Sequence, residues 1–340
     1  MESFLELSFE DMLIRFPPDT HDTFALIFKE LYSELTLSQK NTFISEIATT
    51  FNRISKNIES LNKEHNRFEF KLMLLPKILN TLVTDFKGQS FLSLFSTFNQ
   101  IEESKLEKIT HTCLELGREL IKNQPKDLGR LIAAQTRQMD PSRPLITPIV
   151  FVAECAKVNP HLSSQIRDLQ GDLEKLLIIQ DKGFLRNLAK QLRYLIHFLK
   201  DPEALYEKLF AEILKNSAKD KLAGHCYFIA GLLKGLGIRQ FKKTQIISRM
   251  QKVFDFSVKK DYKDIHVNVR KGCVLLGEAL WLVFDRLFEP CLKELLDFLL
   301  KFLGDSNEEI RVLTRVVMDK VMLNISEFGI KQILPILMKG

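Results

Sequence analysis

Hydrophobic residues recur at intervals of three and four along most of this chain, with polar residues between them. Residues 290–305 show the pattern clearly, with hydrophobic side chains at Leu292, Leu295, Leu296, Leu299 and Leu303. This spacing places an apolar stripe along one face of an α-helix, and Gly304 stands where such a helix would end. No segment alternates polar and apolar residues between turn signals, so we predict an all-α protein.

The carboxy-terminal part of the chain repeats itself. The segments "DIHVNVR" (264–270) and "DSNEEIR" (305–311) each run from an aspartate to an arginine, and their aspartates are 41 residues apart. Asp220 precedes a similar helical pattern 44 residues before Asp264. A period of this length that holds two helices is typical of HEAT repeats. We therefore predict an α-solenoid of HEAT- or armadillo-like helical repeats.

The shared spacing within these segments suggests how neighbouring repeats would be joined. Asp264 and Asp305 would cap or precede a helix, and Arg270 and Arg311 follow one to two turns later. An arginine at that position can reach the aspartate of the neighbouring repeat through charge-assisted hydrogen bonds. We predict a ladder of such pairs along the seam between repeats.

We divide the chain at residue 200. Residues 201–340 carry the HEAT-like repeats, whereas residues 1–200 contain helical patterns too diverged to assign to repeats. Residues 329–340 read as the first helix of a repeat without its partner, so we predict that the last repeat is incomplete. Its hydrophobic residues, Ile333 and Leu334 among them, would then be partly uncovered.

Composition and charge narrow the class of protein. Of the 340 residues 45% are hydrophobic and 27% charged, which is close to the average of folded globular proteins. The five cysteines are scattered and form no C-x-x-C pair, which favours reduced thiols and a cytosolic or nuclear protein. The amino terminus is acidic, unlike an export signal, and the longest apolar stretch (144–156) is too short for a membrane span. We predict a cytoplasmic location and no membrane contact.

The stretch "AGHCYFIAGLLKGLGI" (223–238) holds four glycines and raises the question of a nucleotide site. No glycine is followed by Lys and then Ser or Thr, and the order of a dinucleotide fingerprint is missing, so neither phosphate loop fits. On a helix, Gly224, Gly231 and Gly235 share one face, where they would let a neighbouring backbone approach closely. Gly237 then reads as the helix stop. We interpret the glycines as structural.

Motifs for chemistry are lacking. His225 and Cys226 offer one potential ligand each, with no second His/Cys cluster nearby in the sequence, and the other histidines are isolated. There is no G-x-S-x-G and no H-E-x-x-H motif. We therefore predict a non-enzymatic protein with no metal, no cofactor and no small-molecule substrate.

Basic residues concentrate between positions 234 and 271. Eleven Lys or Arg and only three Asp fall there, a local net charge of +8, while the whole chain carries +6. The ordinary interpretation is a solvated helix face with long lysine side chains; the alternative is contact with RNA or another acidic partner. The candidate contact residues are Lys242, Lys243, Lys259, Lys260, Lys263 and Lys271.

Three segments in register resemble a known family. Residues 224–238, "VRKGCVLLGEALWLVFDRLFEPCL" (269–292) and residues 303–340 are similar to successive motifs of the very large general-control translational activator, Gcn-one. The resemblance covers about 120 residues, and it departs from the family where His225 and Cys226 replace two alanines. Residues 1–200 show no motif that we can match.

The resemblance implies a HEAT-repeat scaffold that rides on translating, often stalled, ribosomes. In the family, such a scaffold works with an ATP-binding-cassette partner protein to activate the stress kinase that phosphorylates an initiation factor during amino-acid starvation. The family's kinase-binding region lies carboxy-terminal to the matched motifs, so direct kinase binding is not implied for these residues. The partner predicted for the basic run is the ribosome, through ribosomal RNA or protein.

Two other classes of function stay open. One is a generic HEAT or armadillo adaptor in transport or microtubule assembly that binds proteins through its inner face. The other is an enzyme with an unrecognised helical active site. Ribosome co-sedimentation separates the first from a translational scaffold, and a pocket with converging ionisable groups would favour the second.

Overall fold

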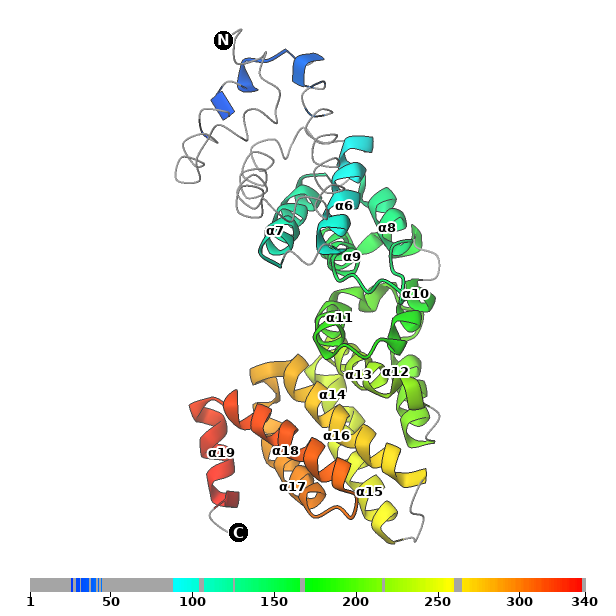
Figure 1. Ribbon diagram of the computed structural model, residues 1–340, viewed down its shortest axis with the longest axis vertical. Coiled ribbons are helices and arrows are strands. Elements are labelled where there is room, and N and C mark those ends of the chain that lie inside the picture. Colours follow the sequence, from blue (N-terminus) through cyan, green and yellow to red (C-terminus); the bar gives the residue numbers. More distant parts are fainter. Residues whose placement is uncertain are drawn as a thin grey trace, which may run out of the picture. The chain divides into compact units, whose positions relative to one another are not determined.

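The computed structural model shows a chain of short antiparallel helices (Figure 1). It describes residues 88–337, apart from 104–106, 125, 166–168, 216–217 and 260–264, and a few positions between 26 and 44. Within this described part there is no β-strand, and the single bridge joins Asp140 to Arg143 in a turn. The prediction of an all-α fold is confirmed.

The chain divides into two compact units, Met1–Arg167 and Asp168–Gly340. The division proposed at residue 200 was drawn where the repeats become recognisable in the sequence, and it stays a prediction. The described helices of unit 1 are α6 (Gly88–Glu103), α7 (Glu107–Asn123), α8 (Leu128–Thr136), α9 (Thr147–Val158) and the 3-10 helix η2 (Pro160–Gln165).

The core of unit 1 is a cluster of phenylalanine rings. Phe91, Phe95 and Phe98 stand one turn apart on α6 and are fully buried. The ring of Phe95 meets the ring of Phe151 of α9 edge-on, with centroids 4.7 Å apart. Edge-to-face contacts of this kind add to the burial of large apolar surfaces. They hold α9 against α6.

Backbone N–H groups at the amino terminus of α9 donate hydrogen bonds to a side chain of a different helix. Glu102, at the end of α6, accepts hydrogen bonds from the backbone N–H groups of Ile146 and Thr147, both at 2.7 Å. The first N–H groups of a helix have no partner within it, so a carboxylate there meets both a hydrogen-bonding need and the positive end of the helix dipole. The chain therefore joins α6 to α9 by polar as well as apolar contacts.

Unit 2 contains the longer series of helices. They are α10 (Leu169–Lys175), α11 (Lys182–Leu195), α12 (Pro202–Leu214), α13 (Leu222–Leu236), α14 (Ile238–Thr244), α15 (Ile246–Lys259), α16 (Ile265–Phe284), α17 (Leu292–Leu303), α18 (Glu308–Leu323) and α19 (Glu327–Leu337). Short 3-10 helices join them: η3 (Leu176–Ile178), η4 (Ile196–Phe198), η5 (Lys219–Lys221) and η6 (Asp285–Cys291).

These helices form two layers. In one layer α11, α13, α16 and α18 pack side by side in chain order. In the other, α15, α17 and α19 follow one another, and α12, α15 and α17 each also pack on a helix of the first layer. Pairs of antiparallel helices that stack in this way are the architecture of a HEAT array.

Helix boundaries follow the local sequence in most places. The side chains of Asp181, Asp201 and Asn307 each accept a hydrogen bond from a backbone N–H in the first turn of α11, α12 and α18. Gly304 ends α17 as predicted. Pro290 lies in the 3-10 segment η6, and α17 begins two residues later at Leu292.

Hydrophobic side chains are exposed on the last two helices. Val316 and Leu323 of α18, and Phe328 and Leu334 of α19, are each more than two-fifths exposed. Ile333, by contrast, is buried, so the expectation that it would be uncovered is wrong. The reason is that α19 turns back to pack on α17 and η6.

Candidate functional site

The glycine face of α13 packs directly on neighbouring backbone. A Cβ atom added to Gly224 would lie 2.1 Å from the carbonyl oxygen of Leu177, and one added to Gly231 would lie 2.7 Å from that of Ala189. A Cβ on Gly235 would lie 3.0 Å from the Cα of Arg193. No side chain fits at the first two positions without moving backbone, so these glycines set the close approach of α13 to η3 and α11.

Gly237 ends α13 with a backbone conformation suited to glycine. Its φ is +91°, where side-chain-bearing residues are strained, and α14 begins at the next residue. The four-glycine stretch is therefore a buried helix and its stop.

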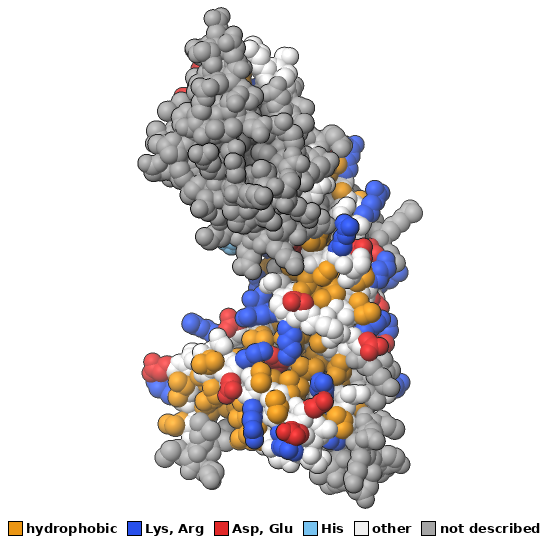
Figure 2. Space-filling model, in the orientation of Figure 1, with side chains coloured by type: hydrophobic (Ala, Val, Ile, Leu, Met, Phe, Trp, Pro, Cys, Tyr) orange, Lys and Arg blue, Asp and Glu red, His pale blue; other side chains and the backbone are white. Residues whose placement is uncertain are grey.

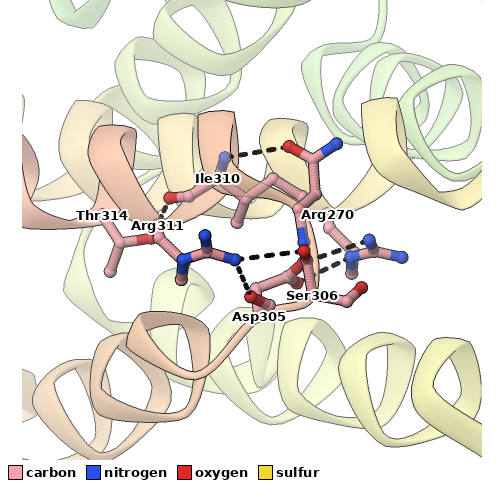
Figure 3. Close-up of polar contacts among 7 residues, drawn as sticks. Arg270, Asp305, Ser306, Ile310, Arg311 and Thr314 are labelled. Carbon is pink, nitrogen blue, oxygen red and sulfur yellow. Dashed lines mark hydrogen bonds and ion pairs between the residues drawn. The ribbon is translucent and has the colours of Figure 1, made fainter.

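An ion pair joins neighbouring repeats at the other end of unit 2 (Figure 3). Arg270 of α16 places its Nε 2.8 Å from the Oδ2 of Asp305, and its Nη2 donates to Oδ1 at 3.1 Å. Both side chains are buried. Asp305 lies in the loop before α18, where it also accepts a hydrogen bond from the N–H of Asn307. Asn307, not Asp305, caps the helix.

Arg311 acts locally. Its Nη1 donates to the backbone carbonyl oxygens of Asp305 and Ser306, at 2.7 and 3.1 Å, so it braces the loop that presents Asp305 to Arg270 (Figure 3). The ladder hypothesis assigned Arg311 to an aspartate of a neighbouring repeat; the contacts seen are to its own loop. Asp264, the matching aspartate one repeat earlier, lies outside the described residues.

His225 and Cys226 make structural contacts. The two ring nitrogens of His225 face the carbonyl oxygen of Lys221, at 2.8 Å, and a carboxylate oxygen of Glu212, at 2.7 Å. Cys226 is fully buried and donates to the carbonyl oxygen of Gly272, and burial raises the pKa of its thiol. Among the described residues no cluster of His, Cys, Asp and Glu could hold a metal ion.

Some described cations of the basic run (234–271) make internal contacts, and others lie at the surface. Lys234 donates to the carbonyl oxygen of Val283, and Arg270 is buried in its ion pair. Arg249 of α15 makes two hydrogen bonds of 2.9 Å to the carboxylate of Glu207 on α12. These three cations therefore stabilise contacts between helices.

The remaining described cations of the run face solvent. Lys242 and Lys243, in the last turn of α14, are exposed, as are Arg239 and Lys252. Lys271 is partly exposed, with its Nζ 3.7 Å from a carboxylate oxygen of Glu309. The side chains of Lys259, Lys260 and Lys263 are not among those the structure describes. On the face shown in Figure 2, basic side chains are interspersed with acidic and hydrophobic ones and form no continuous positive area.

Two charged features of the first layer escaped the sequence analysis. The carboxylate of Glu278 on α16 is buried and forms ion pairs with the Nζ of Lys182 on α11, at 2.7 Å, and the Nζ of Lys320 on α18, at 2.5 Å. These ion pairs link three helices. Arg186, Lys190 and Arg193 form a row along α11, and α13 brings Lys234 beside it. The helices that meet in each group are far apart in the chain, so no local window of sequence contains them; the absence of any acid in residues 182–195 was the one available signal.

Comparisons with known proteins agree with this architecture. The family model "EF3 N-terminal HEAT repeat" matches residues 223–340. The human "Stalled ribosome sensor GCN1" is 24% identical over 302 residues, which is 86% of this chain and 10% of that protein. The "eIF-2-alpha kinase activator GCN1" of Dictyostelium discoideum is 28% identical over 194 residues, 56% of this chain and 7% of that protein. The "Protein ILITYHIA" of Arabidopsis thaliana is 26% identical over 197 residues, 56% of this chain and 7% of that protein.

These matches support the GCN1-like HEAT-repeat character that the resemblance predicted, and the human match extends it beyond the 120 or so residues recognised from motifs. The chain spans a tenth or less of the length of these relatives. No solved structure gave a significant match. Within the described residues, no helix is both long and apolar enough to cross a membrane.

Proposed function

We propose that this chain is a non-enzymatic, cytoplasmic HEAT-repeat scaffold of translational control that binds ribosomes and contributes to activation of the stress kinase that phosphorylates an initiation factor. The observation that carries the proposal is the match to proteins named as a stalled ribosome sensor and an eIF-2-alpha kinase activator, over as much as 86% of the chain. By the same resemblance, an ATP-binding-cassette protein is a further partner.

The exposed end of α14 supplies a contact surface that suits this role. Lys242 and Lys243 stand next to each other in its last turn, with Arg239 one turn before. Exposed lysines of this kind attract phosphate backbones without selecting a sequence, and they do so with a strong dependence on salt. Lys259, Lys260, Lys263 and Lys271 stay predicted contacts from the sequence.

Ribosome co-sedimentation tests the proposal. The protein should pellet with ribosomes at low salt, and the pelleted fraction should fall as salt rises, because binding releases counterions from the phosphate backbone and added salt opposes that release. The variant Lys242→Glu/Lys243→Glu should abolish most of the association, whereas Lys242→Arg/Lys243→Arg should keep it. Lys200→Glu/Lys215→Glu serves as a matched control, because both lysines are exposed and flank α12 instead of α14.

Two results would contradict the proposal. If the protein stays in the supernatant at low salt, ribosome binding is wrong and a generic adaptor becomes the better interpretation. If it pellets but the α14 and control variants behave alike, the surface is assigned wrongly. The kinase contribution is tested separately, by the phosphorylation of the initiation factor in starved cells that carry the α14 variant.

A further inference from the structure

Helix α11 carries an unusual charge pattern. Its 14 residues include Lys182, Arg186, Lys190 and Arg193 and no acidic residue. Arg186, Lys190 and Arg193 follow at intervals of four and three, so they share one face and form a row about 10 Å long at about 1.5 Å per residue. Like charges at this spacing destabilise an isolated helix. An anion bound along the row would offset this repulsion.

The glycine face of α13 brings a fourth cation to this row. Because Gly231 and Gly235 allow α13 to lie directly on Ala189 and Arg193, the last turn of α13 runs beside the basic face of α11. Lys234, next to Gly235, is held there by its hydrogen bond to the carbonyl oxygen of Val283. The same glycines that mark the family resemblance therefore position the charge.

The electrostatic environment of the row is positive. Partial burial lowers the pKa of Lys190, and the charges of Arg186 and Arg193 lower it further. The pKa of Lys234 is lowered by partial burial, then by Arg193 and Lys190. The carboxylate of Asp285, in η6, acts in the opposite direction on both lysines. The charges that act on these two lysines are therefore mostly positive, so a bound anion would relieve repulsion.

The surroundings favour phosphates over a peptide. Along α11 the side chains beside the row are polar: Asn187 is exposed and Gln191 is partly exposed. No large hydrophobic residue of α11 is exposed that could anchor an acidic peptide. Proteins contact the phosphates of nucleic acids through arginine and lysine side chains, and also through the polar side chains of asparagine and glutamine.

We propose that Arg186, Lys190, Arg193 and Lys234 bind the phosphate backbone of RNA. The choice of RNA over other phosphate polymers rests on the proposed function, because ribosomal RNA is the polyanion that a ribosome-bound scaffold meets. These residues are other than the α14 lysines, and contacts to a phosphate backbone read no sequence.

The test is fluorescence anisotropy of the whole protein with a labelled RNA duplex of about 20 base pairs, somewhat longer than a typical double-stranded RNA footprint. The variant Arg186→Gln/Lys190→Gln/Arg193→Gln should reduce the slope of log affinity against log salt by about 2–3 units, since each phosphate contact contributes about 0.7–0.9. The charge-conserving Arg186→Lys/Arg193→Lys should keep the slope. Lys200→Gln/Lys215→Gln/Lys221→Gln, which removes three exposed charges elsewhere, should also leave it unchanged.

A further single variant and a competitor keep the outcome clear. Arg193→Gln alone changes an exposed side chain and should lower the slope by about 1 unit, which gives an answer even if the triple variant folds poorly. An unchanged slope in Arg193→Gln and in the triple variant would overturn the proposal. So would displacement of the RNA by an equally charged glutamate peptide at equal concentration, because the surface would then be a site for acidic protein segments.

The experiments distinguish a failure of the proposed function from a failure of the RNA-binding proposal. If the α11 variants lose RNA binding while the wild-type protein does not pellet with ribosomes, RNA binding stands and the proposed function fails. If the α14 variants lose ribosome binding while the α11 variants keep full RNA affinity, the proposed function stands and this inference fails.

Discussion

The buried pair of Arg270 and Asp305 allows a sharp prediction about the seam between repeats. Asp305→Ala would remove the carboxylate that Arg270 meets at 2.8 Å and leave a guanidinium in a site where its side chain is only 8% exposed. It would also remove the acceptor of the Asn307 N–H. An uncompensated buried charge is the expensive consequence, because the guanidinium keeps its burial and loses the carboxylate that offsets its charge.

The expected magnitude follows from that burial. Breaking a buried pair by removing one partner costs about 3–5 kcal/mol, compared with about 0–1 kcal/mol for an exposed pair. At about 2–4 °C per kcal/mol for a domain of this size, the melting temperature should fall by roughly 6–20 °C. The double variant Arg270→Met/Asp305→Asn removes the charge and keeps an oxygen for the Asn307 N–H. It should recover most of the stability.

Urea unfolding followed by tryptophan fluorescence is the assay. Trp281, the chain's single tryptophan, is buried in α16, the helix that carries Arg270. The comparison is between wild type, Asp305→Ala, Arg270→Met and the double variant. Destabilisation below about 1 kcal/mol in each single variant, with simple additivity in the double, would show that water reaches the pair. The seam would then not depend on it.

Three further predictions concern mainly unit 2. Gly231→Ala should lower the free energy of unfolding by about 1–3 kcal/mol, because the added Cβ would meet the backbone of Ala189. Gly277→Ala is the control, since its added Cβ would meet mainly the tip of Leu295, at 3.0 Å. The control should be destabilised less in the same urea titration. Arg311→Ala should cost about 0.5–1.5 kcal/mol, because its hydrogen bonds to the two loop carbonyls are only partly buried, and a change within error would dismiss the bracing role. In native protein, a thiol reagent monitored by mass spectrometry should modify Cys291 first. Burial raises the pKa of all five thiols, but Cys291 is partly exposed, whereas Cys113, Cys155, Cys226 and Cys273 are buried. Prior labelling of any of those four would mean that the helices open locally.

Some of the candidate site could be read from the sequence, and some could not. The glycine face, its stop at Gly237 and the exposed lysines of α14 each belong to one helix, whose periodicity is local information. The partners of His225 and Lys234 include Glu212 and the carbonyl of Val283, which belong to other helices. No spacing rule predicts them, because the crossing of two helices decides which residues meet.

The basic run shows the same limit more strongly. The local excess of basic residues is visible in the sequence. In the structure, however, Arg249 and Arg270 pair with acids on other elements, whereas Lys242 and Lys243 stay exposed. Meanwhile the row on α11 gains Lys234 from a helix about 40 residues later.

The sequence by itself determined that this protein is helical, where many of its helices end, and that its glycines serve close packing, since each follows from a period of about 3.6 residues and the conformational freedom of glycine. Only the tertiary structure decided which charges are buried in pairs and which face solvent. The physical reason is that burial depends on the neighbouring helix: a charge next to an acid across the seam is stabilised inside, and a charge without one stays where water can reach it.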